Sequence, residues 1–332
     1  MRLENTLALT HGKLVNEPFV NSFENIVFDA RSVKRGDLFI AFDDRAIEEA
    51  IFNGAYGILF DKPTQITDSE IAWIKVEDTQ TALKRLLRFR LIEKEVNVYE
   101  CNEVILKLAL QVITEPSFIA ISSDVISTSQ ALWNIEKNST LLFCPQISDS
   151  DIYADVKTFP KTAMAPVEIM EQTLFETSFI YDNIFYERQL ISPFFIPYLE
   201  ELLHLFKSLK INFRLRKFTP IDHFEAVFTN KKFEIKEFGT SDKVLIFEKN
   251  KSLIASEINY LQNNASWANI IYIIPFVHTD EFSENEDTYT YKNEKEIIGL
   301  LRANSFHFAL IVGVDKSILE RPISLQTQPT LF

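Results

Sequence analysis

A polar turn near the middle of the chain is the strongest candidate for phosphate chemistry. It follows an apolar run at residues 118–121 and precedes a helical pattern at residues 130–135. Strand, polar turn and helix in this order form the setting of a phosphate-binding loop, where N–H groups at a helix N-terminus bind phosphate oxygens. The residues that could donate hydrogen bonds to an anion here are Ser122, Ser123, Asp124, Ser127 and Thr128.

Glycine, the residue from which such loops are built, is scarce in this chain. Only 7 of the 332 residues are glycine, and none lies between Gly57 and Gly239. A phosphate loop needs positive φ angles and a close approach of the backbone that a Cβ atom would block. The sequence therefore does not predict a nucleotide site of the usual kind in the middle of the chain.

The remaining reactive side chains give no pattern of a metal or nucleophile site. Cys101 and Cys144 stand far apart with no C-x-x-C motif, which is typical of two buried thiols in a reducing compartment. The histidines show no H-x-x-H or H-x-x-x-H pairing, and no G-x-S-x-G motif occurs. We therefore predict no metal and a structural role for each histidine: His11, His204, His223, His278 and His307.

Length and charge limit the possible functions. At 332 residues the chain exceeds the roughly 250–300 residues at which one core usually splits, so two or three domains are expected. A net charge of −13 disfavours nucleic acid and anionic membranes as partners. The longest apolar run, residues 270–277, falls short of the ~20 needed to insert across a bilayer, and residues 1–15 lack a signal-peptide pattern. A cytoplasmic protein is expected.

Alternating short strands and helices must position these residues. Near the N-terminus we expect strands at 26–28, 38–42 and 56–60, with a turn at 31–36 and a helix at 46–52 that ends at Asn53-Gly54. In the middle, helices are expected at 106–112 and 191–209.

The last third of the chain has the pattern of a parallel sheet. Apolar strands at 244–247, 270–274 and 308–312 alternate with helical patterns at 253–261 and 294–303. Strands separated by helices in this way form a parallel sheet with right-handed crossovers. A Rossmann-like domain is predicted.

Residues 26–60 carry a motif of known type. They read IVFDARSVKRGDLFIAFDDRAIEEAIFNGAYGILF, which resembles the pattern D-S-R-x-V-x-x-G-D-L-F-x-A-L, a loop, and E-A-x-x-x-G-A in the first domain of the Mur ligases of the MurF and MurE type. These enzymes add amino acids or dipeptides to a UDP-N-acetylmuramoyl peptide. The matching residues are Asp29, Arg31, Val33, Gly36, Asp37, Leu38, Phe39, Ala41, Glu49, Ala50, Gly54 and Ala55. The segments Val76-Glu77-Asp78 and Ala82-Leu83 resemble a further family motif, V-x-D-x-x-x-A-L.

The resemblance implies an α/β fold with a three-domain Mur-ligase-like architecture. Its expected parts are a UDP-substrate-type domain at 1–97, a shortened central P-loop-type domain that lacks the P-loop at 98–220, and a Rossmann-like domain at 221–332. The family's stretch I-T-G-S-N-G-K-T-T-T aligns Ser123 and Ile126 with its glycines and Ser127 with its lysine. Only Thr128 matches, so the phosphate loop is degenerate.

The resemblance also implies a substrate site at Asp29, Arg31 and Ser32, where Arg31 could pair with a diphosphate. The family serine is replaced by Ala30, and the family's D-G-H-x-F loop is missing. An alternative role for Arg31 is a structural salt bridge to Asp29 or Asp37.

In the last domain the family residues are replaced as well. His223-Phe224-Glu225 stands where the family has G-R-x-E, and Lys243 to Asn250 takes the place of D-D-S-Y-N-A-N-P. The arginine that would approach ATP is therefore missing.

The favoured interpretation is a Mur-ligase homologue without catalytic residues or a cofactor. It would act in or near peptidoglycan precursor synthesis by binding a UDP-N-acetylmuramoyl peptide or a cytoplasmic cell-wall enzyme. Two alternatives remain open: an active ATP-dependent amide ligase of the D-Ala-D-Ala-adding type with a rebuilt nucleotide site, and an interaction protein unrelated to the cell wall.

Overall fold

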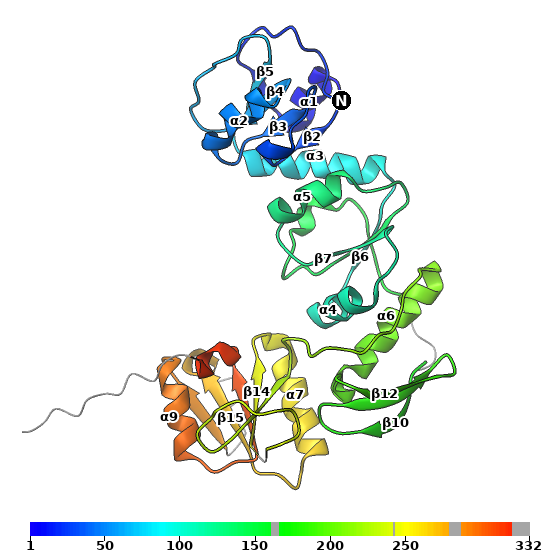
Figure 1. Cartoon of the computed structure of the whole chain (residues 1–332), viewed down its shortest axis with the longest axis vertical. Coiled ribbons are helices and arrows are strands. Elements are labelled where there is room, and N and C mark those ends of the chain that lie inside the picture. Colours follow the sequence, from blue (N-terminus) through cyan, green and yellow to red (C-terminus); the bar gives the residue numbers. More distant parts are fainter. Residues whose placement is uncertain (161–165, 242, 279–286, 321–332) are drawn as a thin grey trace, which may run out of the picture. The chain divides into compact units, whose positions relative to one another are not determined.

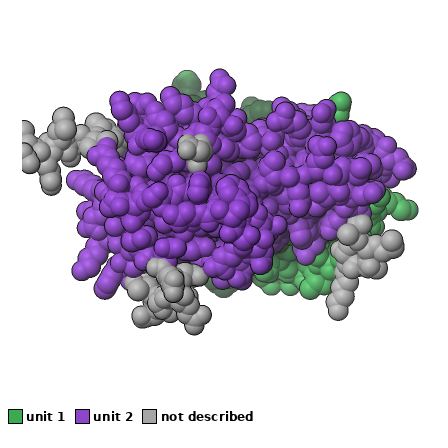
Figure 2. Space-filling model, turned by 90° about the horizontal axis from the view of Figure 1, so that it is seen from below, with its two compact units in different colours: residues 1–162, 204–214 green, residues 163–203, 215–332 purple. Residues whose placement is uncertain are grey.

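The computed structural model describes residues 1–160, 166–241, 243–278 and 287–320. The chain divides into two compact units, which are described separately below: unit 1 comprises residues 1–162 and 204–214, and unit 2 comprises residues 163–203 and 215–332 (Figure 2). No helix among the described residues is long and apolar enough to cross a membrane.

Unit 1 begins with a five-stranded sheet in the order β1-β5-β4-β3-β2 (Figure 1). Its strands β2 to β5 are parallel, and β1 runs antiparallel to β5. The central strands are apolar throughout because both faces of the sheet are buried. The strands are β1 (Lys13–Leu14), β2 (Ile26–Val27), β3 (Leu38–Ile40), β4 (Gly57–Phe60) and β5 (Ala72–Lys75).

Three helices cover this sheet: α1 (Leu3–Thr10), α2 (Ile47–Phe52) and α3 (Thr79–Glu93). Helix α3 begins at Asp78, whose side chain accepts a hydrogen bond of 2.7 Å from the Thr81 N–H. Its buried stripe packs on the same face as α1, while α2 packs on the opposite face, around Trp73.

A second, parallel sheet in unit 1 has the order β7-β8-β6-β9. Its strands are β6 (Asn97–Glu100), β7 (Phe118–Ile121), β8 (Thr140–Phe143) and β9 (Val156–Lys157), with helices α4 (Glu103–Val112) and α5 (Val125–Trp133). Helix α5 packs against α3, so one hydrophobic core runs from the first sheet to the second.

Unit 2 contains an antiparallel sheet in the order β10-β11-β12. The strands are β10 (Glu168–Gln172), β11 (Thr177–Tyr181) and β12 (Ile184–Gln189). The long helix α6 (Ile196–Leu209) follows. Leu199, Leu202 and Leu203 of this helix are buried.

The larger sheet of unit 2 has the order β13-β14-β17-β15-β16, with β13 as its antiparallel edge. Helix α9 packs on one face, where Ile297 and Leu301 join the core of the sheet. The elements are β13 (Glu225–Thr229), β14 (Lys243–Glu248), α7 (Lys251–Asn264), β15 (Ile270–Pro275), β16 (Thr288–Tyr291), α9 (Lys295–Ala303) and β17 (Phe308–Val312).

Short 3-10 helices connect these elements. They are η1 (Ala30–Ser32), η2 (Asp44–Ala46), η3 (Ser150–Ile152), η4 (Pro193–Phe195), η5 (Phe276–His278) and η6 (Lys316–Leu319).

Most predicted elements are present, several with shifted boundaries: the strand predicted at 38–42 ends at Ile40, and the helix predicted at 106–112 begins at Glu103. The helix predicted at 130–135 begins five residues earlier, because Asp124 caps it and Val125 is already helical. The helix predicted at 191–209 begins at Ile196, after the 3-10 turn η4 that starts at Pro193. The α-helices and strands that had not been predicted are α1, α3, β1, β5, β6, β8, β9, those of the antiparallel sheet β10-β11-β12, β13 and β16.

Candidate functional site

The turn predicted to face an anion lies at the N-terminus of α5, directly after β7. Asp124 is the N-cap of this helix. Its Oδ1 accepts hydrogen bonds of 2.9 Å from the Ile126 N–H and 3.1 Å from the Ser127 N–H. The Ser127 hydroxyl donates to Oδ2 at 2.7 Å. The carboxylate of Asp124 therefore occupies the donors that a phosphate-binding loop would offer to its ligand.

The hydroxyl of Thr128 is also used within the chain. The Thr128 hydroxyl donates to the backbone oxygen of Asp124 at 2.9 Å. Ser122 and Ser123 connect β7 to the cap. The hydrogen bonds from the Ser127 side chain and backbone hold the pKa of Asp124 below its usual range. This carboxyl is therefore charged, and its hydrogen bonds are made within the helix that it caps. The five predicted residues thus lie together in one turn.

We expect the Asp124→Ala variant to lose about 1 kcal/mol of unfolding free energy, because two N–H groups of α5 lose their acceptor. Urea unfolding followed by circular dichroism measures this difference. Ser123→Ala is the matched control, since it truncates the neighbouring side chain outside the cap, and it should unfold like the wild type. Equal midpoints for Asp124→Ala and Ser123→Ala would contradict the assigned cap.

The predicted substrate residues Asp29, Arg31 and Ser32 lie in and next to η1. Asp29 caps this turn, and its Oδ1 accepts from both the backbone N–H and the Nε of Arg31, each at 3.2 Å. Of the two salt bridges open to Arg31 from the sequence, the one to Asp29 is formed. Asp37 is instead buried and accepts from the Lys34 N–H at 2.9 Å.

The pair at η1 is exposed, with 78% of the Arg31 side chain and 49% of the Asp29 side chain open to solvent. The hydrogen bond from the Arg31 side chain holds the pKa of Asp29 below its usual range. An exposed pair of this kind contributes little stability, so Arg31 can exchange Asp29 for another anion at small cost. Within the described residues, no hydrogen bond or ion pair joins η1 to the N-terminus of α5.

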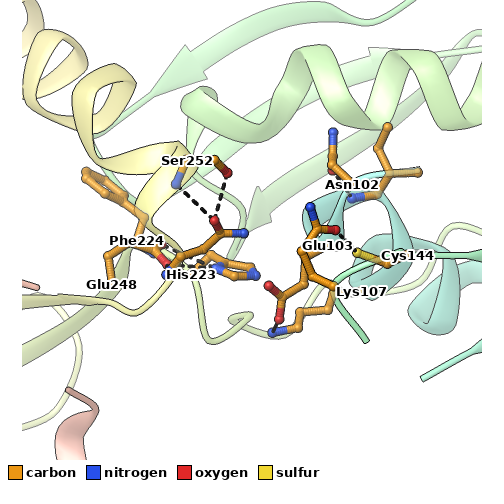
Figure 3. A network of polar contacts seen from close by, with 11 residues as sticks. Asn102, Glu103, Lys107, Cys144, His223, Phe224, Glu248 and Ser252 are labelled. Carbon is orange, nitrogen blue, oxygen red and sulfur yellow. Dashed lines mark hydrogen bonds and ion pairs between the residues drawn. The ribbon is translucent and has the colours of Figure 1, made fainter. Parts of the chain in front are cut away.

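A buried polar cluster that the sequence did not predict lies at the carboxyl end of β14 (Figure 3). The Glu248 carboxylate lies 3.0 Å from His223 Nδ1 and accepts a 3.0 Å hydrogen bond from the Phe224 N–H. Burial alone would raise the pKa of Glu248, but the hydrogen bonds, that of His223 foremost, outweigh it and leave the pKa lowered. Phe224 is held at a φ of 46°, a strained angle for a bulky residue, and such strain is frequent at functional sites.

A second carboxyl group, that of Glu257 on α7, belongs to the same cluster. Its side chain is fully buried, and in the ionised state its oxygens accept no hydrogen bond from the described residues; the protonated carboxyl can donate to Glu248. Burial, together with the negative charge of Glu248, raises the pKa of Glu257 well above its usual value and so favours the protonated form. One charged and one neutral carboxyl side by side is an arrangement that can hold a proton.

A sequence signal for Glu257 does exist. Leu253, Ile254, Ile258 and Leu261 form the buried stripe of α7, and Glu257 falls on that stripe by its spacing. Among the described residues no group of three or more His, Cys, Asp or Glu side chains is placed to hold a metal ion.

Comparisons with known proteins agree with this geometry at the level of the fold. No protein-family model matches the chain, and no curated protein matches it. A crystal structure of MurF from Acinetobacter baumannii covers 96% of this chain and 99% of its own, with a TM-score of 0.54 and 10% identity. The MurF ligase from Thermotoga maritima in complex with ADP covers 89% and 95%, with a TM-score of 0.51 and 11% identity. The chain therefore has the multi-domain α/β fold of the Mur ligases, as the motif at residues 26–60 predicted.

Proposed function

We propose that this chain is a non-catalytic Mur-ligase homologue that acts by binding, in or near the synthesis of peptidoglycan precursors. The observation that carries the proposal is the cap at α5, where the chain's own Asp124 carboxylate takes the N–H groups of Ile126 and Ser127. The Thermotoga neighbour was solved with ADP. In this chain a nucleotide phosphate at the helix N-terminus would meet a fixed negative charge.

The losses at this turn can be compared in magnitude. A phosphate-loop lysine supplies charge-assisted hydrogen bonds of roughly 1.5–3 kcal/mol each, and its position in the alignment holds Ser127, which bonds to Asp124 instead. Ile126, 39% exposed, stands where backbone would have to approach a phosphate. These changes reinforce one another, so we favour loss of the nucleotide over a rebuilt ligase site.

The ligand we favour is a UDP-N-acetylmuramoyl peptide, bound through its diphosphate at Arg31. The supporting feature is the exposed Arg31–Asp29 pair, in which the guanidinium can turn to an anion with a small loss of stability. The bound diphosphate would replace one carboxylate by two phosphate groups, which bond a guanidinium bidentately.

Calorimetric titration with two ligands tests the proposal. We expect no heat of binding with magnesium ATP and weak binding of UDP-N-acetylmuramoyl pentapeptide. Arg31→Ala should weaken the second ligand by about 1.5–3 kcal/mol, the size of a charge-assisted bond. Arg45→Ala is a matched control, because Arg45 follows the cap Asp43 in η2 as Arg31 follows Asp29 in η1.

The two titrations, with magnesium ATP and with the pentapeptide, can contradict the proposal independently. Saturable binding of magnesium ATP would contradict the non-catalytic assignment and favour the rebuilt ligase. Equal pentapeptide affinities for Arg31→Ala and Arg45→Ala would return Arg31 to a structural role. If neither ligand binds, affinity capture with mass spectrometry tests the other proposed partner, a cytoplasmic cell-wall enzyme, and partners from an unrelated pathway would overturn the cell-wall role.

A further inference from the structure

Unit 2 contains an aromatic pocket at the end of its larger sheet that lies away from Glu248. The pocket has a volume of about 540 Å³ and reaches the beginnings of two parallel strands, at Val244 of β14 and Phe308 of β17, which are paired in register. Ligands of α/β sheets usually bind at the opposite, carboxyl ends of the strands. The lining residues belong to unit 2, whereas Arg31 and Asp124 of the proposed function belong to unit 1.

Six aromatic side chains line the pocket: Phe175, Phe228, Phe238, Tyr260, Trp267 and Phe308. The walls are contributed by β13 and the loop after it, by α7, by β17 and by the turn between β10 and β11, which lies beside α7 in Figure 1. The ring of Phe175 in this turn lies 6.1 Å from those of Phe228 and Phe308, centroid to centroid. A volume of 300–1,000 Å³ with aromatic walls is typical of sites that bind most of a small ligand's surface.

Trp267 marks the open side of the pocket. Its side chain is 71% exposed, although its ring lies 5.9 Å from those of both His307 and Phe308. A tryptophan this exposed loses much of the free energy that burial of its ring would supply. A flat ligand ring stacked against Trp267 would supply that burial.

The polar groups at the pocket indicate which hydrogen-bonding groups the edge of the ligand should carry. His307 Nδ1 accepts a 2.9 Å hydrogen bond from the Asn269 N–H, so in the neutral ring the proton is on Nε2, which is a donor. Asn264 Nδ2 donates to the backbone oxygen of Tyr260 at 2.9 Å, which leaves its Oδ1 as an acceptor. His307 and Asn264 thus add a donor and an acceptor to the polar groups that line the pocket.

Charge limits the ligand further. Among the described residues, the side chains that line the pocket include no lysine or arginine, and the carboxylate in the lining, that of Glu176, is paired with Arg188 at 3.6 Å. An anionic ligand would therefore meet no unpaired cation in this lining, and the net charge of −13 disfavours it further. We propose that this pocket is a binding site for an uncharged small molecule with a flat aromatic ring system and a hydrogen-bonding edge.

Two fluorescent probes with the same ring system test the proposal. N-phenyl-1-naphthylamine is uncharged, and 8-anilinonaphthalene-1-sulfonate carries the same rings with an added sulfonate. We expect the uncharged probe to bind at one site, with a dissociation constant about tenfold lower than that of the sulfonate, and Glu176→Gln to narrow this difference.

Variants locate the probe. Trp267→Ala should raise the dissociation constant of the uncharged probe about tenfold, and Asn264→Trp should abolish its binding by filling the pocket. Phe52→Ala is the control, because it removes an aromatic ring that is 91% exposed elsewhere in the chain. Melting curves confirm that the variants are folded. Unchanged binding in both pocket variants, an equal loss in Phe52→Ala, or tighter binding of the sulfonate by the wild type would overturn the proposal.

Discussion

Replacement of Glu257 by glutamine is expected to stabilise the protein, and the gain should grow with pH. Glu257 is fully buried, and its pKa in the folded protein is raised well above the usual 4.5 by burial, by the charge of Glu248 and by the hydrogen bond that its protonated form donates to Glu248. Between these two pKa values the folded protein holds one proton more than the unfolded chain. Stability of the wild type therefore falls as pH rises, by about 1.4 kcal/mol per pH unit.

A glutamine side chain does not titrate, so the unfolding free energy of the variant lacks this decrease with pH. Glu248, His223 and Tyr198 are the other titratable groups near Glu257, and they remain in both proteins. Glu248 changes the stability with pH in the opposite direction. Its pKa is lower in the folded protein than in the unfolded chain, so it stabilises the fold above the unfolded pKa, and this stabilisation is lost as the pH falls through the folded pKa. Because the hydrogen bond from Glu257 is one of the causes that lower the pKa of Glu248, glutamine, which keeps a side-chain donor at this position, is the substitution that changes this contribution least.

Urea unfolding at a series of pH values between 4.5 and 8.5 measures the gap between the two proteins. Near pH 4.5 the protonation of Glu257 in the folded protein and in the unfolded chain is most alike. The difference in unfolding free energy between the two proteins should therefore be small there. Glu237→Gln, at an exposed position of the same unit, is the matched control and should follow the wild type. Parallel curves for Glu257→Gln and the wild type would contradict a protonated Glu257.

Apolar runs and glycine-marked turns predicted much of the fold. Leu38 to Ile40, the first part of the strand predicted at 38–42, and Phe308 to Val312 lie in buried parallel strands, because strands covered on both faces have no polar positions to obscure the pattern. The strand β10 was missed for the opposite reason. All five of its residues are exposed, so Glu168 to Gln172 show no apolar alternation.

The candidate site was predicted in part. The sequence placed Asp124 and Ser127 in a turn between a strand and a helix, and that turn exists. The direction of the Asp124 side chain was not predictable, because a carboxylate in such a turn can face outward to a ligand or inward to the helix. The pairing of His223 with Glu248 joins residues 25 positions apart, and the pairing arises only when β14 brings its end beside His223.

Trp133 is expected to be among the most sensitive positions of unit 1, and Trp133→Ala should lower the unfolding free energy by about 3–5 kcal/mol. Its side chain is 6% exposed in the core that α3 and α5 share. Its Nε1 donates to Asn25 Oδ1 at 2.7 Å, and the guanidinium of Arg90 lies 5.0 Å from its ring. Truncation leaves a cavity and removes both contacts.

Trp133→Phe should cost less, because it keeps a ring in the core and loses the hydrogen bond to Asn25. The control is Trp267→Ala, the same truncation at a side chain that is 71% exposed, and its stability should change by less than about 1 kcal/mol. Guanidinium unfolding of the three variants ranks them. Similar losses for Trp133→Ala and Trp267→Ala would contradict a core shared by α3 and α5, since burial is what separates the two tryptophans.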